Sequence, residues 1–355
     1  MKKLLYLSAV LALFAQCKKE DTVPDVLPTL VTTFRESGLD VDWDQSGSNR
    51  IMYSSKGNDT YYDIHFAQPD GSNDVCLTCD HPLLPNKHIS NPGWHPSGKW
   101  IIMVVEEATH PGSSTDALPG FGAYCDIWVM NDIGTKAYKI VDLPNDYDHG
   151  VIAPRFSPDG SKIIWTDRKA QPNILIPTQT FGFWTIKMAD FAFGATDSIP
   201  YIGNTQTFEP VANNFYESYG FSPDGSKIIF CSSMNKPSVW DQQIYTMDTT
   251  GNNIVQLTQT DYNEHGFYKP DGSKIVWMSN TNSTRGGTDW WIMNTDGTDK
   301  KRLTFFNEKH NVQDAGHAVW AGLGSFSPTG TRFIGGVQQS LTTQEGKIVM
   351  VDLVP

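Results

Sequence analysis

The chain has 355 residues, of which 39% are hydrophobic and 12% are aromatic, and its formal net charge is −12 at pH 7. With 30 Gly and 21 Pro, this composition is typical of a globular protein with many short strands and turns. The acidic balance, without any basic run, argues against a nucleic-acid partner, because phosphate binding requires clustered Lys and Arg.

The N-terminus has the pattern of a secretory signal. Two lysines precede an apolar run over residues 4–15, which is too short to span a bilayer in the mature protein. The sequence LFAQC then resembles a bacterial lipoprotein cleavage site, which implies that Cys17 is acylated; an ordinary secreted protein is the alternative. We expect a signal peptide over residues 1–16, a tether over 17–27 and a folded domain over 28–355, lipid-anchored to the outer membrane in the periplasm or at the cell surface.

One turn motif recurs six times along the rest of the chain. Its clearest copies read FSPDGSK, with an aromatic residue that closes one strand and a Pro that presets φ in a type I turn. Asp or Ser bonds back to the backbone, and Gly takes the left-handed position before the next strand. The copies begin at Trp43, Trp94, Phe156, Phe221, Tyr268 and Phe326.

A second Gly-containing turn follows each copy, after a strand of aromatic and aliphatic residues. Two hairpins in each repeat make four antiparallel strands, which we call a, b, c and d from the axis outward, and this is the pattern of a propeller blade. Helical periodicity is missing from the repeats, which excludes an α-solenoid. The sequence therefore predicts an all-β fold, a six-bladed β-propeller with blades over residues 38–85, 86–147, 148–208, 209–262, 263–314 and 315–355.

The last blade is one strand short. Residues 347–351 have the pattern of its strand c, and the chain given ends soon after. The β-rich residues 30–34 stand before the first blade and match the missing outer strand. We therefore predict that this N-terminal strand closes the last blade and leaves no open sheet edge at the seam.

The repeat resembles a known family. Residues 291–304, WIMNTDGTDKKRLT, and the SPDGSK copies are similar to the TolB-type, WD40-like β-propeller repeat over nearly all of residues 38–355. This resemblance implies the fold. It implies no single activity, because the repeat serves translocation accessory proteins, peptidase domains, polysaccharide lyases and scaffolds.

Loop lengths indicate which face of the propeller carries function. The a–b and c–d turns lie on one face and are short, whereas the b–c loops and d–a crossovers lie on the other face and vary in length. Long variable loops on a rigid scaffold are where ligands usually bind. The longest are residues 106–124, 168–181, 199–216 and 305–323.

Histidines and aromatic residues are frequent on this variable face. Converging His and Glu side chains can bind a divalent metal or act as a general base, and aromatic rings can stack on a sugar or a protein. The candidate ligand-binding residues are His88, His149, Glu217, Trp240, His265, His317 and Trp320. Similar propellers in the oligogalacturonate lyases hold manganese with His and Gln; this resemblance implies a possible Mn or Ca site at His265, His310, Gln313 and His317.

No nucleophile elbow, phosphate loop or dinucleotide fingerprint is present in the sequence, so we assign no catalytic residue. We predict a monomeric binding or assembly module that holds an envelope protein or a glycan. The alternative is a metal-assisted polysaccharide lyase, or another carbohydrate-active enzyme, with a His-rich site at the channel mouth. The acidic charge favours the binding module, because polyuronate substrates require Arg or Lys near the site.

Two further sets of residues are interpreted as structural. Residues three apart in an extended strand point to opposite faces, so the sequence leaves open whether Cys76 and Cys79 form a local disulfide. Cys125 and Cys231 are read as small buried side chains. Four carboxylates near the start of strand c are expected to support the repeat: Asp63, Asp126, Asp241 and Asp289.

Overall fold

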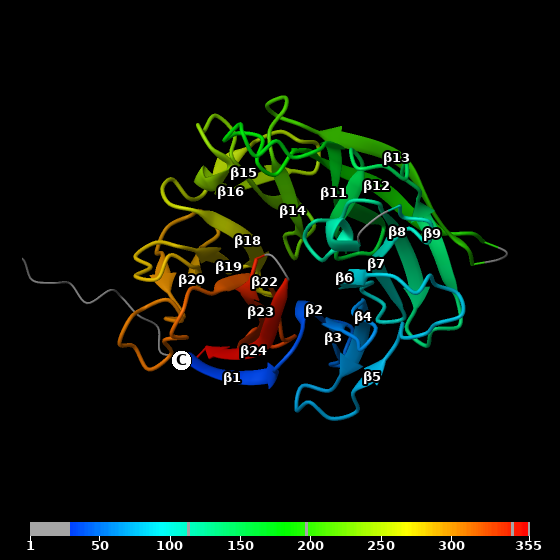
Figure 1. Cartoon of the computed structure of the whole chain (residues 1–355), viewed down its shortest axis with the longest axis horizontal. Coiled ribbons are helices and arrows are strands. Elements are labelled where there is room, and N and C mark those ends of the chain that lie inside the picture. The colour runs from blue at the N-terminus through cyan, green and yellow to red at the C-terminus, as the bar shows by residue number, and fades with distance from the viewer. Residues whose placement is uncertain (1–28, 112–113, 196–197, 342–343, 354–355) are drawn as a thin grey trace, which may run out of the picture.

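Six four-stranded antiparallel sheets are arranged as blades around a central axis (Figure 1). This computed structural model describes residues 29–111, 114–195, 198–341 and 344–353. It confirms the predicted all-β, six-bladed propeller. The proposed signal peptide, the tether and Cys17 lie outside the described residues. Within the described ranges, no helix is long and apolar enough to cross a membrane.

The strands of each sheet lie within the range predicted for its blade, apart from the closing strand β1. Blade one contains β2 (Leu39–Trp43), β3 (Ile51–Lys56), β4 (Tyr62–Ala67) and β5 (Val75–Cys76). Blade two contains β6 (Ile89–Trp94), β7 (Trp100–Glu106), β8 (Cys125–Asn131) and β9 (Ala137–Val141). Blade three contains β10 (Gly150–Phe156), β11 (Lys162–Ala170), β12 (Phe183–Phe193) and β13 (Pro200–Phe208).

The remaining three blades have the same order. Blade four contains β14 (Tyr216–Phe221), β15 (Lys227–Ser232), β16 (Gln243–Asp248) and β17 (Val255–Gln256). Blade five contains β18 (Asn263–Tyr268), β19 (Lys274–Ser279), β20 (Asp289–Asn294) and β21 (Lys301–Arg302). Blade six contains β22 (Trp320–Phe326), β23 (Arg332–Ser340), β24 (Glu345–Leu353) and β1 (Thr29–Arg35). Two short 3-10 helices, η1 (Ser114–Ala117) and η2 (Val239–Asp241), lie in b–c loops.

Strand β1 closes the ring as predicted. It pairs antiparallel with β24, from Thr29 opposite Leu353 to Thr33 opposite Val349, and Figure 1 shows the two strands side by side. At the end of β1, Arg35 Nε donates to the Tyr53 hydroxyl at 3.0 Å and Nη2 donates to the Gly71 carbonyl at 2.9 Å. The closing strand therefore completes blade six and also ties it to blade one.

The repeated turn has the predicted chemistry. In blade four the Gly225 N–H donates to the Ser222 carbonyl at 2.8 Å, and Gly225 has a φ of +71°. Asp224 Oδ1 accepts from the Ser226 N–H at 3.0 Å and from the Ser222 hydroxyl at 2.5 Å. These hydrogen bonds lower the pKa of Asp224 to about 2. Each turn is thus stabilised by residues within a few positions of one another.

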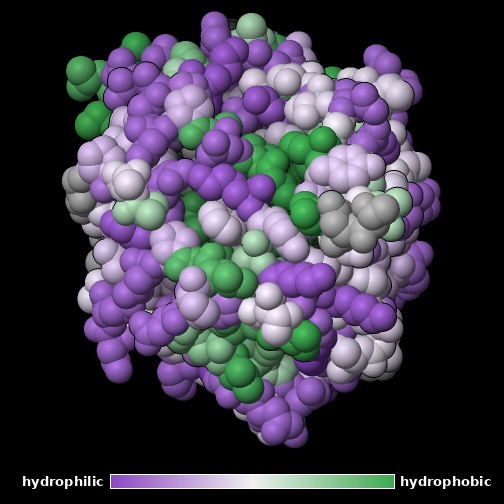
Figure 2. All heavy atoms as spheres, turned by 90° about the vertical axis from the view of Figure 1, so that its right-hand side faces the viewer, coloured by the Kyte–Doolittle hydropathy of each residue, from purple (hydrophilic) through white to green (hydrophobic). Residues whose placement is uncertain are grey.

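Hydrophobic side chains fill the spaces between blades. Trp165 and Trp277, which occupy equivalent positions in blades three and five, are among the largest fully buried side chains. Figure 2 shows the outer wall at the right of Figure 1, where hydrophobic side chains gather in a central band among hydrophilic ones. Trp100, Phe193 and Ile202 of blades two and three are partly buried and pack against the core.

Three of the four expected carboxylates support strand c. Asp63 accepts from the Thr78 hydroxyl at 2.6 Å, Asp126 from the Leu143 N–H at 2.9 Å and Asp289 from the Thr304 hydroxyl at 3.0 Å. The expectation for Asp241 was wrong. It lies in η2, and the equivalent position in blade four is Gln243, next to the Ile244 N–H that donates to the Thr258 hydroxyl at 2.9 Å.

The outer strand of blade four is shorter than its sequence pattern indicates. The pattern over residues 255–258 indicates a four-residue strand, but β17 ends at Gln256. Beyond it, the Ile244 N–H of strand c donates to the hydroxyl of Thr258 instead of to a backbone carbonyl.

Cys76 and Cys79 form a disulfide, with their Cα atoms 5.7 Å apart. The chain leaves β5 after Cys76 and bends, so the two side chains are not held in one extended strand. Cys125 and Cys231 are buried and free.

Candidate ligand-binding cavity

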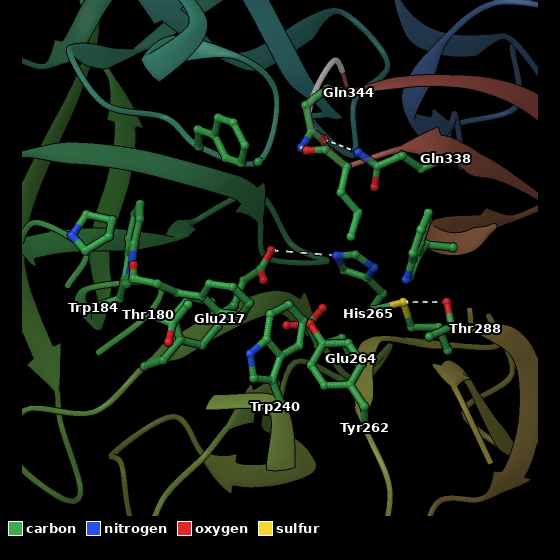
Figure 3. Close-up of a pocket in the computed structure, with 18 of the residues that line it drawn as sticks. Thr180, Trp184, Glu217, Trp240, Tyr262, Glu264, His265, Thr288, Gln338 and Gln344 are labelled. Atoms are coloured by element: carbon green, nitrogen blue, oxygen red, sulfur yellow. Dashed lines mark hydrogen bonds and ion pairs between the residues drawn. The ribbon is translucent and has the colours of Figure 1, made fainter. Parts of the chain in front are cut away.

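A cavity of about 540 Å³ opens on the face of b–c loops and d–a crossovers (Figure 3). Blades three to six contribute to its wall from the strand ends nearest this face, through Arg168 of β11, Glu217 of β14, His265 of β18 and Trp320 of β22. A second cavity, of about 410 Å³, lies on the opposite face and is lined by repeat-turn residues such as Pro158. The first cavity lies on the face where function is predicted.

Aromatic rings line much of this cavity: Phe181, Trp184, Phe215, Trp240, Tyr262 and Trp320. Trp240 is 51% exposed, and its ring centroid lies 5.0 Å from Phe181 and 5.7 Å from Tyr262. The short helix η2 fixes its backbone, because the Ser238 hydroxyl accepts from the Trp240 N–H at 3.1 Å. An indole held this way presents apolar surface to a ligand with little loss of conformational entropy.

Two carboxyl groups line the cavity, that of the buried Glu264 and that of Glu217, whose side chain is 13% exposed. Glu217 and Glu264 occupy the second position of strand a in blades four and five, and each has an oxygen within 4.8 Å of the Cys231 sulfur and of the other. Burial raises the pKa of Glu264 to about 7 and that of Glu217 well above its ordinary value. Among the described residues, neither carboxylate has a Lys or Arg within 4.0 Å.

His265 points toward the pair, with its Nε2 3.9 Å from Glu217 Oε1 (Figure 3). The register of β18 shifts between Glu264 and Phe267, and His265 has a φ of +54°. Such a bulge re-aims a side chain at the strand end. Burial lowers the pKa of His265 to about 4, so the imidazole is neutral at pH 7 and gives the carboxylates no positive charge.

Arg168 lies elsewhere in the cavity wall and is only 3% exposed. Its guanidinium carbon lies 4.8 Å from the Tyr147 ring centroid and 5.4 Å from that of Trp184. One nitrogen, Nη2, donates to the Tyr147 carbonyl, whereas the buried Nε has no hydrogen-bond partner. No carboxylate of the described chain lies within 4.0 Å of this guanidinium. Burial lowers its pKa.

The titration of Glu264 gives a testable pH dependence. The folded protein keeps its proton up to about pH 7, whereas an unfolded chain loses it near a pKa of about 4.3. The protonated Glu264 therefore makes its full contribution to stability below the pKa of the unfolded chain, about 4.3, and this contribution is lost as the pH rises toward 7. We expect the free energy of unfolding of the wild type, minus that of Glu264→Gln, to fall with rising pH by at most about 1.4 kcal/mol per unit.

Urea denaturation at four pH values between 4.5 and 7.5 measures this difference. Glu345→Gln is the matched control for removing a carboxylate, because the side chain of Glu345 is 61% exposed. A flat difference for Glu264→Gln would contradict the burial argument.

The structure gathers four of the seven candidate residues into the cavity: Glu217, Trp240, His265 and Trp320. It places the other three outside it. His88 is buried and its Nδ1 accepts from the Tyr62 N–H at 3.1 Å, and His149 contacts Asp146 at 2.7 Å through Nδ1. His317 lies exposed in the crossover before β22.

The four candidate metal ligands are not brought together. The described chain contains three groups of His, Cys, Asp or Glu side chains in which the ligand atoms of each group lie within 4.8 Å of one another. None of these groups contains His265, His310 or His317. Gln313 Oε1 accepts from the Phe305 N–H at 2.8 Å. The loop carrying these residues is held against blade five, where Arg285 Nε contacts Asp314 at 2.5 Å.

No protein-family model matches the sequence, and no curated protein matches it. Solved structures do match. TolB from Acinetobacter baumannii has a TM-score of 0.55 and 19% identity over 86% of this chain and 64% of that one. The chain has the TolB-like propeller fold. It spans slightly less than two thirds of that TolB protein.

Two oligogalacturonate lyases are also similar to this TolB-like propeller. The enzyme from Vibrio parahaemolyticus has a TM-score of 0.53 and 11% identity over 93% of this chain and 97% of that one. A lyase in complex with manganese has a TM-score of 0.52 and 12% identity over 93% and 95% of the two chains. At these identities the likeness is one of fold alone.

Sequence reasoning missed several residues of the cavity in this TolB-like propeller. Glu264 is the main one, and a signal for it exists: it holds the same place in β18 as Glu217 holds in β14. Phe181, Trp184 and Phe215 gave no such signal, because hydrophobic residues near strand ends usually belong to the core. Arg168 stands at the start of the 168–181 loop, and no local pattern indicates that its side chain is buried in the cavity wall.

Proposed function

We propose that this TolB-like propeller is a binding module, and that its ligand enters the cavity on the b–c and d–a face. The observation that carries the proposal is a cavity of about 540 Å³ that is lined by aromatic rings and by the ionisable side chains of Arg168, Glu217 and Glu264. Ligand sites have this volume and this combination of apolar walls with a few polar groups. The half-exposed Trp240 at its wall supplies the contact surface for an envelope protein or a glycan.

The cellular setting belongs to the same proposal. A lipid anchor at Cys17 would hold the propeller at the envelope, with residues 17–27 as a tether and the variable face free to meet its partner. Cys17 lies outside the described residues, so its acylation stays a prediction.

Trp240→Ala should weaken ligand binding at least tenfold, because exposed aromatic anchors typically contribute that much at binding sites. The fold should survive, because half of this side chain is already in water. Binding is measured by intrinsic fluorescence and calorimetry against a panel of oligosaccharides and short peptides. Tyr201→Ala is the control, since Tyr201 is 55% exposed on β13 and does not line the cavity. Equal affinities for both variants and the wild type would refute a site at this cavity.

The lyase alternative has one observation in its favour, the group of Glu217, Cys231 and Glu264. This group fits manganese or calcium poorly, because those ions prefer oxygen ligands and burial keeps the Cys231 thiol protonated by raising its pKa. Of the predicted His and Gln set, His265 lies 3.9 Å from Glu217, whereas His310, Gln313 and His317 do not line the cavity. Adding oligogalacturonides to the panel, with and without Mn²⁺, and following the absorbance of unsaturated products tests this alternative directly.

A further inference from the structure

We propose that the cavity recognises a zwitterionic ligand, an amino acid or short peptide, with Arg168 binding its free carboxylate and the Glu217–Glu264 pair binding its free ammonium group. This inference rests on the proposed binding function and names the ligand class of the same site.

The first observation is the state of Arg168. A guanidinium that is 97% buried loses its hydration, and a folded protein normally compensates for that loss with a carboxylate and a full set of hydrogen bonds. Here the described chain offers one backbone carbonyl, two aromatic faces and the more distant carboxylates of Asp116 and Asp148, and leaves Nε without a partner. Arginine binds carboxylates through paired N–H donors, so a ligand carboxylate would complete this environment.

The second observation is that the carboxyl groups of Glu217 and Glu264 lack a cationic partner, whereas Arg168 lacks an anionic one. Two carboxyl groups share a buried site whose nearest basic group is the neutral His265, 3.9 Å from Glu217. The aromatic rings of Trp240 and Tyr262 line the same part of the cavity (Figure 3). Carboxylates beside aromatic faces favour an ammonium group, through ion pairing and cation–π attraction together.

The third observation is that the Arg168 guanidinium and the Glu217–Glu264 carboxyl pair line one cavity without pairing with each other, and a bound ammonium group would favour the ionised form of the pair. Buried acids and bases in a protein core usually form ion pairs, because leaving either alone is costly. In this wall Arg168 stacks on Trp184, which Figure 3 shows apart from Glu264 and Tyr262. A ligand with one charge of each sign would satisfy both ends, and 540 Å³ leaves room for a side chain between them.

Other ligand classes match this wall less well. A neutral oligosaccharide would stack on the rings but would leave Arg168 without an anionic partner and the Glu217–Glu264 pair without a cationic one. A polyuronate would satisfy Arg168 but would bring its other carboxylates toward Glu217 and Glu264, where like charges repel.

Calorimetry with three forms of one dipeptide, Ala-Phe, tests the inference on the intact folded protein. The free dipeptide should bind, and its N-acetyl form and its C-terminal amide should each bind about tenfold or more weakly, since each loses one charge-assisted contact. Arg168→Gln should abolish the preference for the free carboxylate and keep the preference for the free amine. Glu217→Gln should do the reverse. Arg332→Gln and Asp352→Asn remove an ion pair that does not line the cavity and should change neither preference.

Equal affinity for the free and blocked dipeptides would overturn the inference, as would binding of oligosaccharides without binding of any zwitterion. In the second case Trp240→Ala would still weaken oligosaccharide binding, so the proposed function would survive. Failure of every ligand in both experiments would remove the proposed function as well. If Arg168→Gln does not fold, the blocked dipeptides on the wild-type protein still decide the matter.

Discussion

Deletion of residues 1–35 should lower the melting temperature by roughly 5–10 °C relative to a deletion of residues 1–27, which keeps β1. Strand β1 supplies the outer strand of blade six along the length of β24. Its removal would expose an unpaired sheet edge. It would also remove Arg35, which contacts Tyr53, Gly71 and Asp74 of blade one. Each lost hydrogen bond costs about 1 kcal/mol, partly offset by the entropy regained by seven residues.

Thermal denaturation followed by circular dichroism measures this effect. A synthetic peptide of residues 28–36 should restore the melting temperature of the shorter protein in a concentration-dependent way, because it binds only the folded state. A scrambled peptide is the control. Equal melting temperatures for the two deletions would show that β1 does not hold the ring closed.

Asp289→Ala should cost about 3–5 kcal/mol of unfolding free energy, because it leaves the buried Arg302 guanidinium without its main partner. Arg302 Nη2 contacts Asp289 Oδ2 at 2.9 Å, and both side chains are at most 5% exposed. The same carboxylate accepts from the Thr304 hydroxyl at 3.0 Å and from the Phe306 N–H at 2.7 Å. The start of β20 therefore depends on this one side chain.

Asp63→Ala provides a matched control for Asp289→Ala. Asp63 has the same place in blade one and accepts from Thr78 at 2.6 Å, but it has no Lys or Arg within 4.0 Å in the described chain. Its loss should cost about 1–2 kcal/mol. Urea denaturation compares the two variants, and Asp289→Leu with Arg302→Met should recover most of the larger loss. Equal costs at the two positions would contradict the role given to the ion pair.

The blades could be predicted because their turns are stabilised locally. Asp224 bonds to residues two positions away on either side, so SPDGS carries its own conformation wherever it occurs. Six copies of such a turn, with alternating strands between them, indicate a six-bladed propeller. Because the last blade lacks an outer strand in its own range, the N-terminal strand β1 could be predicted to supply it. Glu217, His265 and Trp320 reach the cavity because the starts of strand a in blades four to six lie on the same face. Trp240 reaches it from the b–c loop of blade four.

The geometry of the cavity depended on contacts between residues far apart in sequence. The bulge in β18 aims His265 inward, and the packing of blades four and five brings Glu217 beside Glu264. The crossover with His310 and His317 is held by Arg285 and Asp314, 29 positions apart, which no local pattern reveals. The sequence by itself determined the fold, the closing strand and the variable face, because short-range turn chemistry and strand periodicity encode them. Only the tertiary structure decided which side chains share a cavity, because loop conformation is set by contacts between blades.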